Sequence, residues 1–120
     1  MAKASQTYEA LLTLAKKRGI YVTVRPMPGP LQGKIRGLYA HNKTGEVLPE
    51  IEDLIWLDAD LTLKERTYAL AHELAHYQLH KDKLPAYYWT NREFNEQIET
   101  ETDRFAQRLL CYVERRLSDK

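Results

Sequence analysis

At 120 residues, the chain is long enough to bury a hydrophobic core in one domain, which we expect to span residues 1–120. Hydrophobic residues make up 43% of it and charged residues 29%, and no apolar run approaches the ~20 residues of a membrane-spanning helix or forms the apolar part of a signal peptide. From these two observations we expect a cytoplasmic protein. Because 18 basic and 17 acidic residues leave a net charge of +1, nucleic acid is a poor candidate for the main ligand.

The first half of the sequence predicts one helix and three short strands. Apolar residues recur at i, i+3, i+4 and i+7 from Tyr8, and the basic cluster "KKR" with Gly19 marks the end of a helix over residues 4–18. The β-branched and aromatic stretch "IYVTV" predicts a strand, and the proline-rich "PMPGP" predicts a loop. "KIRGLYAHN" and "EDLIWLDA" alternate sufficiently for two more strands, joined by a turn around "NKTGE".

The second half predicts two longer helices. "LTLKERTYALAHELAHYQLH" has a helical period, and Thr62 followed by Glu65 is typical of a capping box at its start. Helix, small three-stranded sheet, helix and helix together predict an α+β domain. The single cysteine, Cys111, has apolar neighbours in "LLCYV", so we expect it to be buried. The last helix has an apolar face made of Ile98, Thr102, Phe105, Ala106, Leu109, Leu110 and Val113.

The stretch "YALAHELAHYQLH" sets histidines and a glutamate among apolar residues. His72, Glu73 and His76 spell HExxH, a pattern typical of zinc metalloproteases. Four residues apart on a helix, the two histidines lie about one turn apart and can reach one tetrahedral ion at about 2.0–2.1 Å. Glu73 is turned by about 100° from His72, which places a proton-accepting carboxylate beside such an ion. A buried helix whose histidines only form hydrogen bonds is the alternative.

A third ligand would decide between these interpretations, because catalytic zinc usually has three protein ligands and one open position. The last helix offers Glu99, Glu101 and Asp103. Glu99 lies at the margin of the apolar face and can point inward, with Asp103 one turn later on the same side. Glu101 points elsewhere, and we expect it to be solvated. We therefore expect Glu99 to be the third ligand and Asp103 to accept an N–H from a ligand histidine.

"LAHELAHYQLH", followed further along by "ExExDxFAxxLL", resembles the ImmA/IrrE family of zinc metallopeptidases, and the resemblance covers most of the chain. It implies a minimal zincin-like fold, with Zn²⁺ held by His72, His76 and Glu99. It also implies that Glu73 is the general base of peptide hydrolysis. Ala75 stands where the family often has glycine, and "CYVERR" replaces the methionine and proline that commonly close the family motif.

The resemblance also implies a substrate, a helix-turn-helix transcriptional repressor of a phage or mobile element. From charge and hydropathy we expect no direct contact with nucleic acid or membrane. The alternative is a regulatory binding module that sequesters a repressor and holds a purely structural zinc. Glu73 separates the two, because a structural zinc site needs no general base. In zincin-like folds an edge strand near the metal pairs with extended substrate, and "DLIWLD", directly before the HExxH helix, is the candidate.

Four further residues are candidates for contacts with the transition state or the substrate. Tyr87, Tyr88 and Arg92 lie between the two predicted ligand helices, where a donor can stabilise an oxyanion, with packing of "AYYWT" over the core as the alternative. His80 is about 12 Å from His72 along the helix axis, which is too far for the same ion. We expect His80 to cap the C-terminal end of the helix, with a substrate contact as the alternative.

Overall fold

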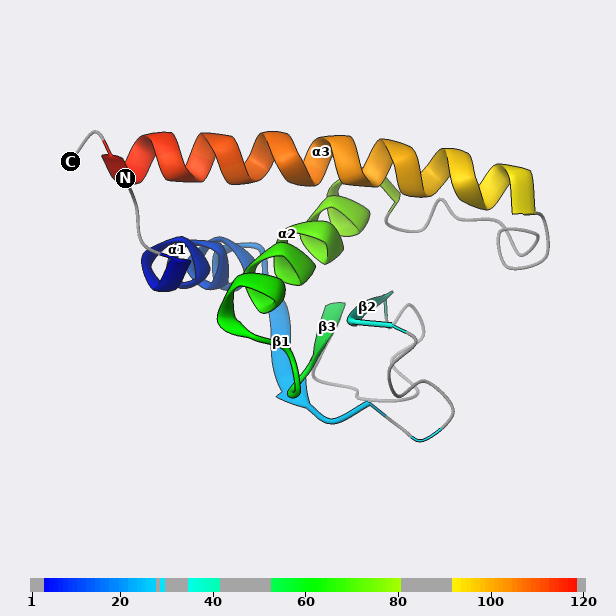
Figure 1. Ribbon diagram of the computed structural model, residues 1–120, viewed down its shortest axis with the longest axis horizontal. Helices are drawn as coiled ribbons and strands as arrows, with labels where there is room; N and C mark the ends of the chain where they lie inside the picture. Colours follow the sequence, from blue (N-terminus) through cyan, green and yellow to red (C-terminus); the bar gives the residue numbers. More distant parts are fainter. Residues whose placement is uncertain (1–3, 28, 30–34, 42–52, 81–91, 119–120) are drawn as a thin grey trace.

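The computed structural model describes residues 4–27, 29, 35–41, 53–80 and 92–118 (Figure 1). It has the α+β fold that the sequence predicts, with three helices and a small mixed sheet. Within the described residues, no helix is long and apolar enough to cross a membrane. In chain order, the elements are α1 (Ala4–Lys17), β1 (Ile20–Arg25), β2 (Gly37–His41), β3 (Asp53–Asp58), α2 (Leu63–His80) and α3 (Arg92–Ser118).

The sheet has the strand order β1-β3-β2. β1 runs parallel to β3, with Ile20 opposite Asp53, and β2 runs antiparallel to β3, with Gly37 opposite Leu57. The prediction that "DLIWLD" is an edge strand is therefore wrong, because this strand is β3 and is hydrogen-bonded on both sides. Among the described strands, β1 and β2 form the two edges.

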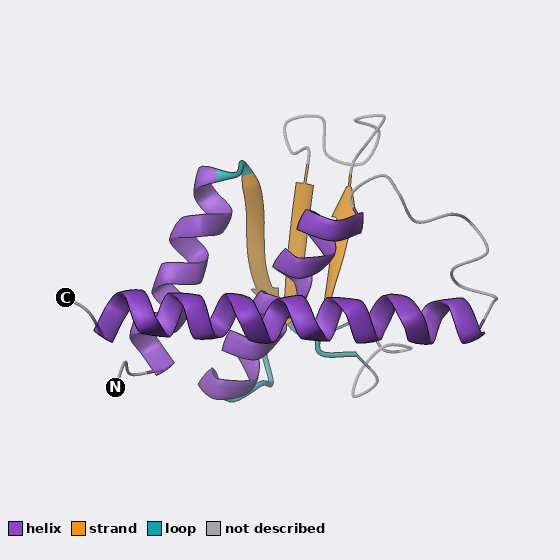
Figure 2. Ribbon diagram, turned by 90° about the horizontal axis from the view of Figure 1, so that it is seen from above, coloured by secondary structure: helices purple, strands orange, loops and turns teal. Residues whose placement is uncertain are grey.

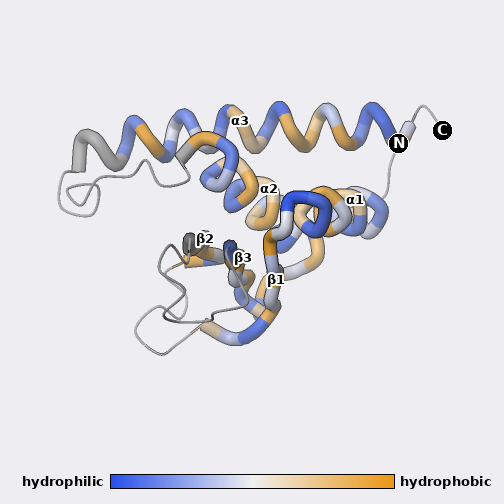
Figure 3. The backbone as a smooth tube through the Cα atoms, turned by 180° about the vertical axis from the view of Figure 1, so that it is seen from behind, coloured by the Kyte–Doolittle hydropathy of each residue, from blue (hydrophilic) through white to orange (hydrophobic). Residues whose placement is uncertain are grey.

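The helices form two layers on one face of the sheet. α1 packs on β1, and α2 packs on β2 and β3. α3 crosses over α1 and α2 on the side away from the sheet, as the views in Figures 1 and 2 show. Hydrophilic and hydrophobic residues alternate along α3 in Figure 3, as expected for a helix that packs on one side only. Among the described residues, the largest fully buried side chains are those of Leu11, Ile55, Leu57, Leu70 and Thr102.

Two helix ends follow the chemistry read from the sequence. The N–H of Gly19 donates to the carbonyl of Lys16 at 3.1 Å, and Gly19 has a φ of 75°, so glycine stops α1 in a left-handed conformation. At the start of α2, the N–H of Thr62 donates to Glu65 Oε1 at 3.0 Å, and the N–H of Glu65 donates to Thr62 Oγ1 at 3.2 Å. This reciprocal pair is a capping box, and it fixes where the HExxH helix begins.

The prediction that Cys111 is buried is wrong, because the cysteine is exposed. The buried side of α3 passes through Ala106 and Val113. Five residues after Ala106, Cys111 is turned by roughly 140° from it, and so it points away from α2. Apolar neighbours in sequence do not bury a residue when the buried stripe of the helix is narrow.

Candidate functional site

α2 carries the HExxH residues through the middle of the molecule, between the sheet and α3 (Figure 1). Glu73 and His76 are buried, at 5% and 8% exposure, and His72 is half-buried. Ala71 and Ala75 are fully buried, and their small side chains let the neighbouring elements approach the helix closely. The two histidines turn toward α3, whereas Glu73 turns toward β2.

His72 and His76 on α2 meet Glu99 on α3. Glu99 Oε2 lies 3.0 Å from His72 Nε2, and Glu99 Oε1 lies 3.3 Å from His76 Nε2. One nitrogen or oxygen atom from each of the three residues can be chosen so that all lie within 4.8 Å of one another. Four tetrahedral ligands at about 2.0–2.1 Å from zinc are roughly 3.3 Å apart. The two distances from Glu99 to the histidines match this spacing. The structure thus brings together the three residues singled out as ligand candidates.

Asp103 lies beside the other ring nitrogen of His72. Asp103 Oδ1 is 2.9 Å from His72 Nδ1, one turn of α3 after Glu99. When Nδ1 carries the ring proton, it donates to this carboxylate. Nε2, which faces Glu99, then keeps a lone pair that can bind a metal ion. Asp103 therefore selects the tautomer of His72 that can bind a metal through Nε2.

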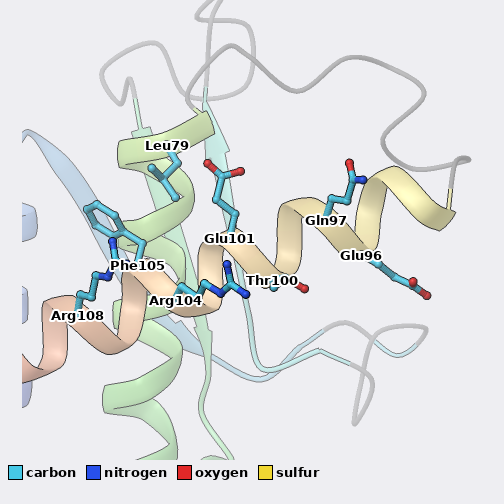
Figure 4. Close-up of a pocket in the computed structure, with 8 residues that line it drawn as sticks. All are labelled: Leu79, Glu96, Gln97, Thr100, Glu101, Arg104, Phe105 and Arg108. Carbon is cyan, nitrogen blue, oxygen red and sulfur yellow. The ribbon is translucent and has the colours of Figure 1, made fainter.

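Glu101 lies apart from this group, as the sequence predicted. It follows Glu99 by two residues, about 200° around the helix, and it is exposed. Its side chain lines an open cavity of about 610 Å³, together with Leu79 and Phe105, where the end of α2 meets the outer flank of α3 (Figure 4). Glu99 and Glu101 thus lie on two different sides of α3, one facing the histidines and the other lining the open cavity.

Tyr68 also belongs to the site, although the sequence analysis did not select it. Its hydroxyl donates to Asp103 Oδ1 at 3.0 Å, and its ring centroid is 6.4 Å from that of His72. Burial raises the pKa of Tyr68, and the hydrogen bond to Asp103 raises it further. The signal in the sequence is the spacing, because Tyr68 precedes His72 by four residues and shares its face of α2.

Burial and neighbouring charges shift the pKa values of Glu73 and His72. Burial raises the pKa of Glu73 to about 7, although His76 and His72 act in the opposite direction. For His72, burial lowers the pKa, but the carboxylates of Glu99, Glu73 and Asp103 outweigh it, and the net pKa is raised. A carboxyl group that titrates near neutral pH is suited to accept and return a proton.

Gly37 at the start of β2 lies against Glu73. A Cβ atom at position 37 would be crowded by the backbone oxygen of Trp56 at 3.1 Å and by Leu57 Cδ2 at 3.2 Å, and it would lie at contact distance, 3.4 Å, from Glu73 Cγ. Two residues later, the ring of Tyr39 meets that of Tyr77 on α2 edge-on, with centroids 5.8 Å apart. β2 therefore packs closely against α2, because Gly37 has no side chain and because Tyr39 contacts Tyr77.

Four candidates from the sequence lie outside what the structure describes. Tyr87 and Tyr88 fall in the segment 81–91, which is not described. Arg92 is the first residue of α3 and His80 is the last residue of α2, and for both the side chain is outside the description. Their suggested contacts with substrate or with the helix end stay predictions.

Comparison with known proteins gives one match. Residues 15–111 match the family model described as the IrrE N-terminal-like domain, peptidase family M78. No curated protein and no solved structure matches the chain. The matched range contains all three strands, α2, and the part of α3 that carries Glu99 and Asp103. Because it spans most of the 120 residues, this protein belongs to the ImmA/IrrE family of peptidases, family M78.

Proposed function

We propose that this protein is a zinc-dependent endopeptidase that cleaves a helix-turn-helix transcriptional repressor of a phage or mobile element. The observation that carries the proposal is the convergence of His72, His76 and Glu99 beside a buried Glu73. Membership of a peptidase family supports the reaction type. The repressor is the substrate that the family resemblance implies, and it is part of the proposal.

The donor atoms at the site fit zinc. Two imidazole nitrogens and one carboxylate oxygen form a ligand set that catalytic zinc uses, and three protein ligands leave a fourth position open. Zinc, when bound, supplies Lewis-acid activation of water and of the peptide carbonyl. Asp103, through its contact with Nδ1, holds the His72 ring in place and keeps Nε2 available as a ligand.

Glu73 has the position and the proton affinity of a general base. Its carboxylate lies one residue after the first ligand candidate, and burial holds its pKa at about 7. In the proposed reaction, this carboxylate takes a proton from the attacking water and returns it to the leaving amine. β2 and the fully buried Ala71 and Ala75 limit the space around α2, so the carboxylate is held in a narrow, largely water-free position.

An extended substrate segment would be aligned by β2 in our proposal. β2 is an edge of the sheet within the described residues, and its first residue, Gly37, lies against Glu73. A peptide that adds to this edge as a further strand passes beside the proposed base. The pairing strand is therefore β2, in place of the central strand "DLIWLD".

The test is a comparison of wild type with Glu73→Gln on a helix-turn-helix repressor of the same phage or mobile element. Glutamine keeps the shape of the side chain but cannot accept the proton, so we expect the cleavage rate to fall by about 10²–10⁴-fold with zinc content unchanged. The readout is mass spectrometry of the repressor after incubation. Glu101→Gln, on the outer flank of α3, is the matched control and should cleave like wild type.

The same pair of variants separates an enzyme from a binding module. A module that only sequesters the repressor has no use for a base, so in that case Glu73→Gln would relieve repression in cells as well as wild type does. That outcome would rule out proteolysis as the function, whereas loss of both cleavage and derepression supports it.

A further inference from the structure

One carboxylate oxygen next to the site accepts from two donors on the same helix. Asp103 Oδ1 lies 3.0 Å from the hydroxyl of Tyr68 and 2.9 Å from His72 Nδ1. Tyr68 and His72 are one turn apart on α2, and their rings are tilted by 35° to each other. Asp103 on α3 thus bridges two neighbouring side chains of α2 at a single atom.

Asp103 needs this second donor because its own surroundings are open. Its side chain is 48% exposed, so a carboxylate bonded to His72 alone could rotate and exchange that bond for water. Tyr68 is half-buried, and burial raises its pKa, so its hydroxyl stays protonated and keeps donating. Its ring lies beside that of His72 on the same face of α2, with centroids 6.4 Å apart, so the donor stands next to the ring that Asp103 orients.

A second donor on Oδ1 also has an opposing effect, because it makes that oxygen a weaker acceptor for His72. A half-exposed carboxylate would accept from water at the same place, however, so the electronic cost is similar with or without the tyrosine. Tyr68 contributes a fixed orientation of the Asp103 carboxylate. Its hydroxyl is attached to α2 and stays in one position, whereas a water molecule at the same place exchanges with solvent. Orientation is therefore the larger effect.

We propose that Tyr68 is a positioning residue for His72 and acts through Asp103. The inference rests on the proposed function in one respect, namely that His72 binds zinc. Tyr68 itself contacts neither metal nor substrate in this role. It fixes the carboxylate, and the carboxylate fixes the ring and tautomer of the ligand.

The test is the zinc affinity of Tyr68→Phe, measured by competition with a chromophoric chelator. Phenylalanine keeps the ring and removes only the hydroxyl, so we expect the dissociation constant to rise by about 2- to 10-fold. This is less than the full value of a hydrogen bond to a carboxylate, because water can replace the hydroxyl at the half-exposed Asp103. Tyr112→Phe, which changes an exposed tyrosine on α3, is the control and should bind zinc like wild type. Thermal unfolding of the chelator-treated variants shows whether the fold is intact.

A double-mutant cycle with Asp103→Ala distinguishes positioning from packing. If Tyr68 acts through Asp103, adding Tyr68→Phe to the Asp103→Ala variant does not lower the zinc affinity any further. The inference is overturned if Tyr68→Phe lowers the zinc affinity equally in wild type and in Asp103→Ala. It is also overturned if the Tyr68→Phe variant has wild-type affinity. In both cases the proposed function stands. A wild-type protein that holds no zinc overturns both, and so the two failures are told apart.

Discussion

α2 and α3 both supply residues to the site, but the fold holds them very differently. α2 is enclosed by the sheet, α1 and α3, and its residues from Ala69 to His76 are buried with the exception of the half-buried His72. α3 lies on the outside of the molecule and buries a narrow stripe (Figure 2). Among its described residues, only Thr102, Ala106 and Val113 are buried.

This difference assigns separate tasks to the two helices. The core of the protein fixes Glu73 and His76, whereas the half-buried His72 also depends on Asp103 for its orientation. Glu99 and Asp103 have side chains that are 36% and 48% exposed, and they depend on how α3 docks. Replacing the buried Glu73 or His76 of α2 should therefore abolish a function, whereas replacing the half-exposed Asp103 of α3 should weaken one.

The largest expected effect is the loss of metal from His76→Ala on α2. Removing one of two imidazole ligands leaves only two protein ligands, too few for the proposed zinc site. Elemental analysis should find about one zinc per wild-type chain and far less in the variant. Gln78→Ala, on the exposed side of the same helix, should keep its zinc. Equal zinc in wild type and His76→Ala would contradict the proposed centre altogether.

The next effect concerns the stability of the metal-free protein. The pKa of Glu73 is about 7 in the folded chain, against 4.5 for an ordinary glutamate, so the folded state binds this proton more tightly. The corresponding stability is fully present below pH 4.5 and is lost as the pH rises through 7, in total about 3 kcal/mol. Urea unfolding with chelator at pH 5 and pH 8 measures it.

Glu73→Gln isolates this contribution, because glutamine does not titrate. His72, whose pKa is also raised in the folded state, destabilises the protein in the same direction on going to high pH. Part of that effect remains in the variant, because Glu99 and Asp103 still raise the pKa of His72 when Glu73 is replaced. We expect the fall in stability from pH 5 to pH 8 to be smaller in Glu73→Gln than in wild type. Identical slopes would mean that Glu73 is not held in the buried position described.

The smallest effects separate two carboxylates of α3. Asp103→Asn should weaken zinc binding by about 10- to 100-fold, because the amide is a poorer partner for His72 Nδ1. Glu101→Gln, two residues earlier, should leave the affinity unchanged. Calorimetric zinc titrations of both variants provide the check. The reverse pattern would show that α3 is rotated about its axis relative to the structure.

Local spacing predicted much of this site, because both motifs are set by helix periodicity. His72 and His76 are one turn apart whatever surrounds them, and the apolar face of α3 predicts which side Glu99 and Asp103 share. The order of the strands was beyond such reasoning. A parallel pair such as β1 and β3 is joined by a long crossover, and alternation within "DLIWLD" does not reveal how many neighbours the strand has.

Tyr68 and Gly37 were missed for a related reason. An aromatic residue inside a buried helix is usually a core residue, and only the position of Asp103 on another helix gives the Tyr68 hydroxyl its partner. Gly37 resembles any strand glycine until Glu73 is placed beside it. Both roles come from contacts between elements distant in sequence, which no local pattern encodes.

The three ligand candidates lie on two different helices, and this affects how firmly α3 is attached to the rest of the protein. An ion held by His72, His76 and Glu99 would be a reversible crosslink that closes the loop between α2 and α3. Such a link stabilises the folded state, in which the three ligands lie together, and the stabilisation grows with the concentration of free ion. The availability of zinc in the cell would then govern how often α3 opens away from the body, and with it how easily the protein itself is degraded.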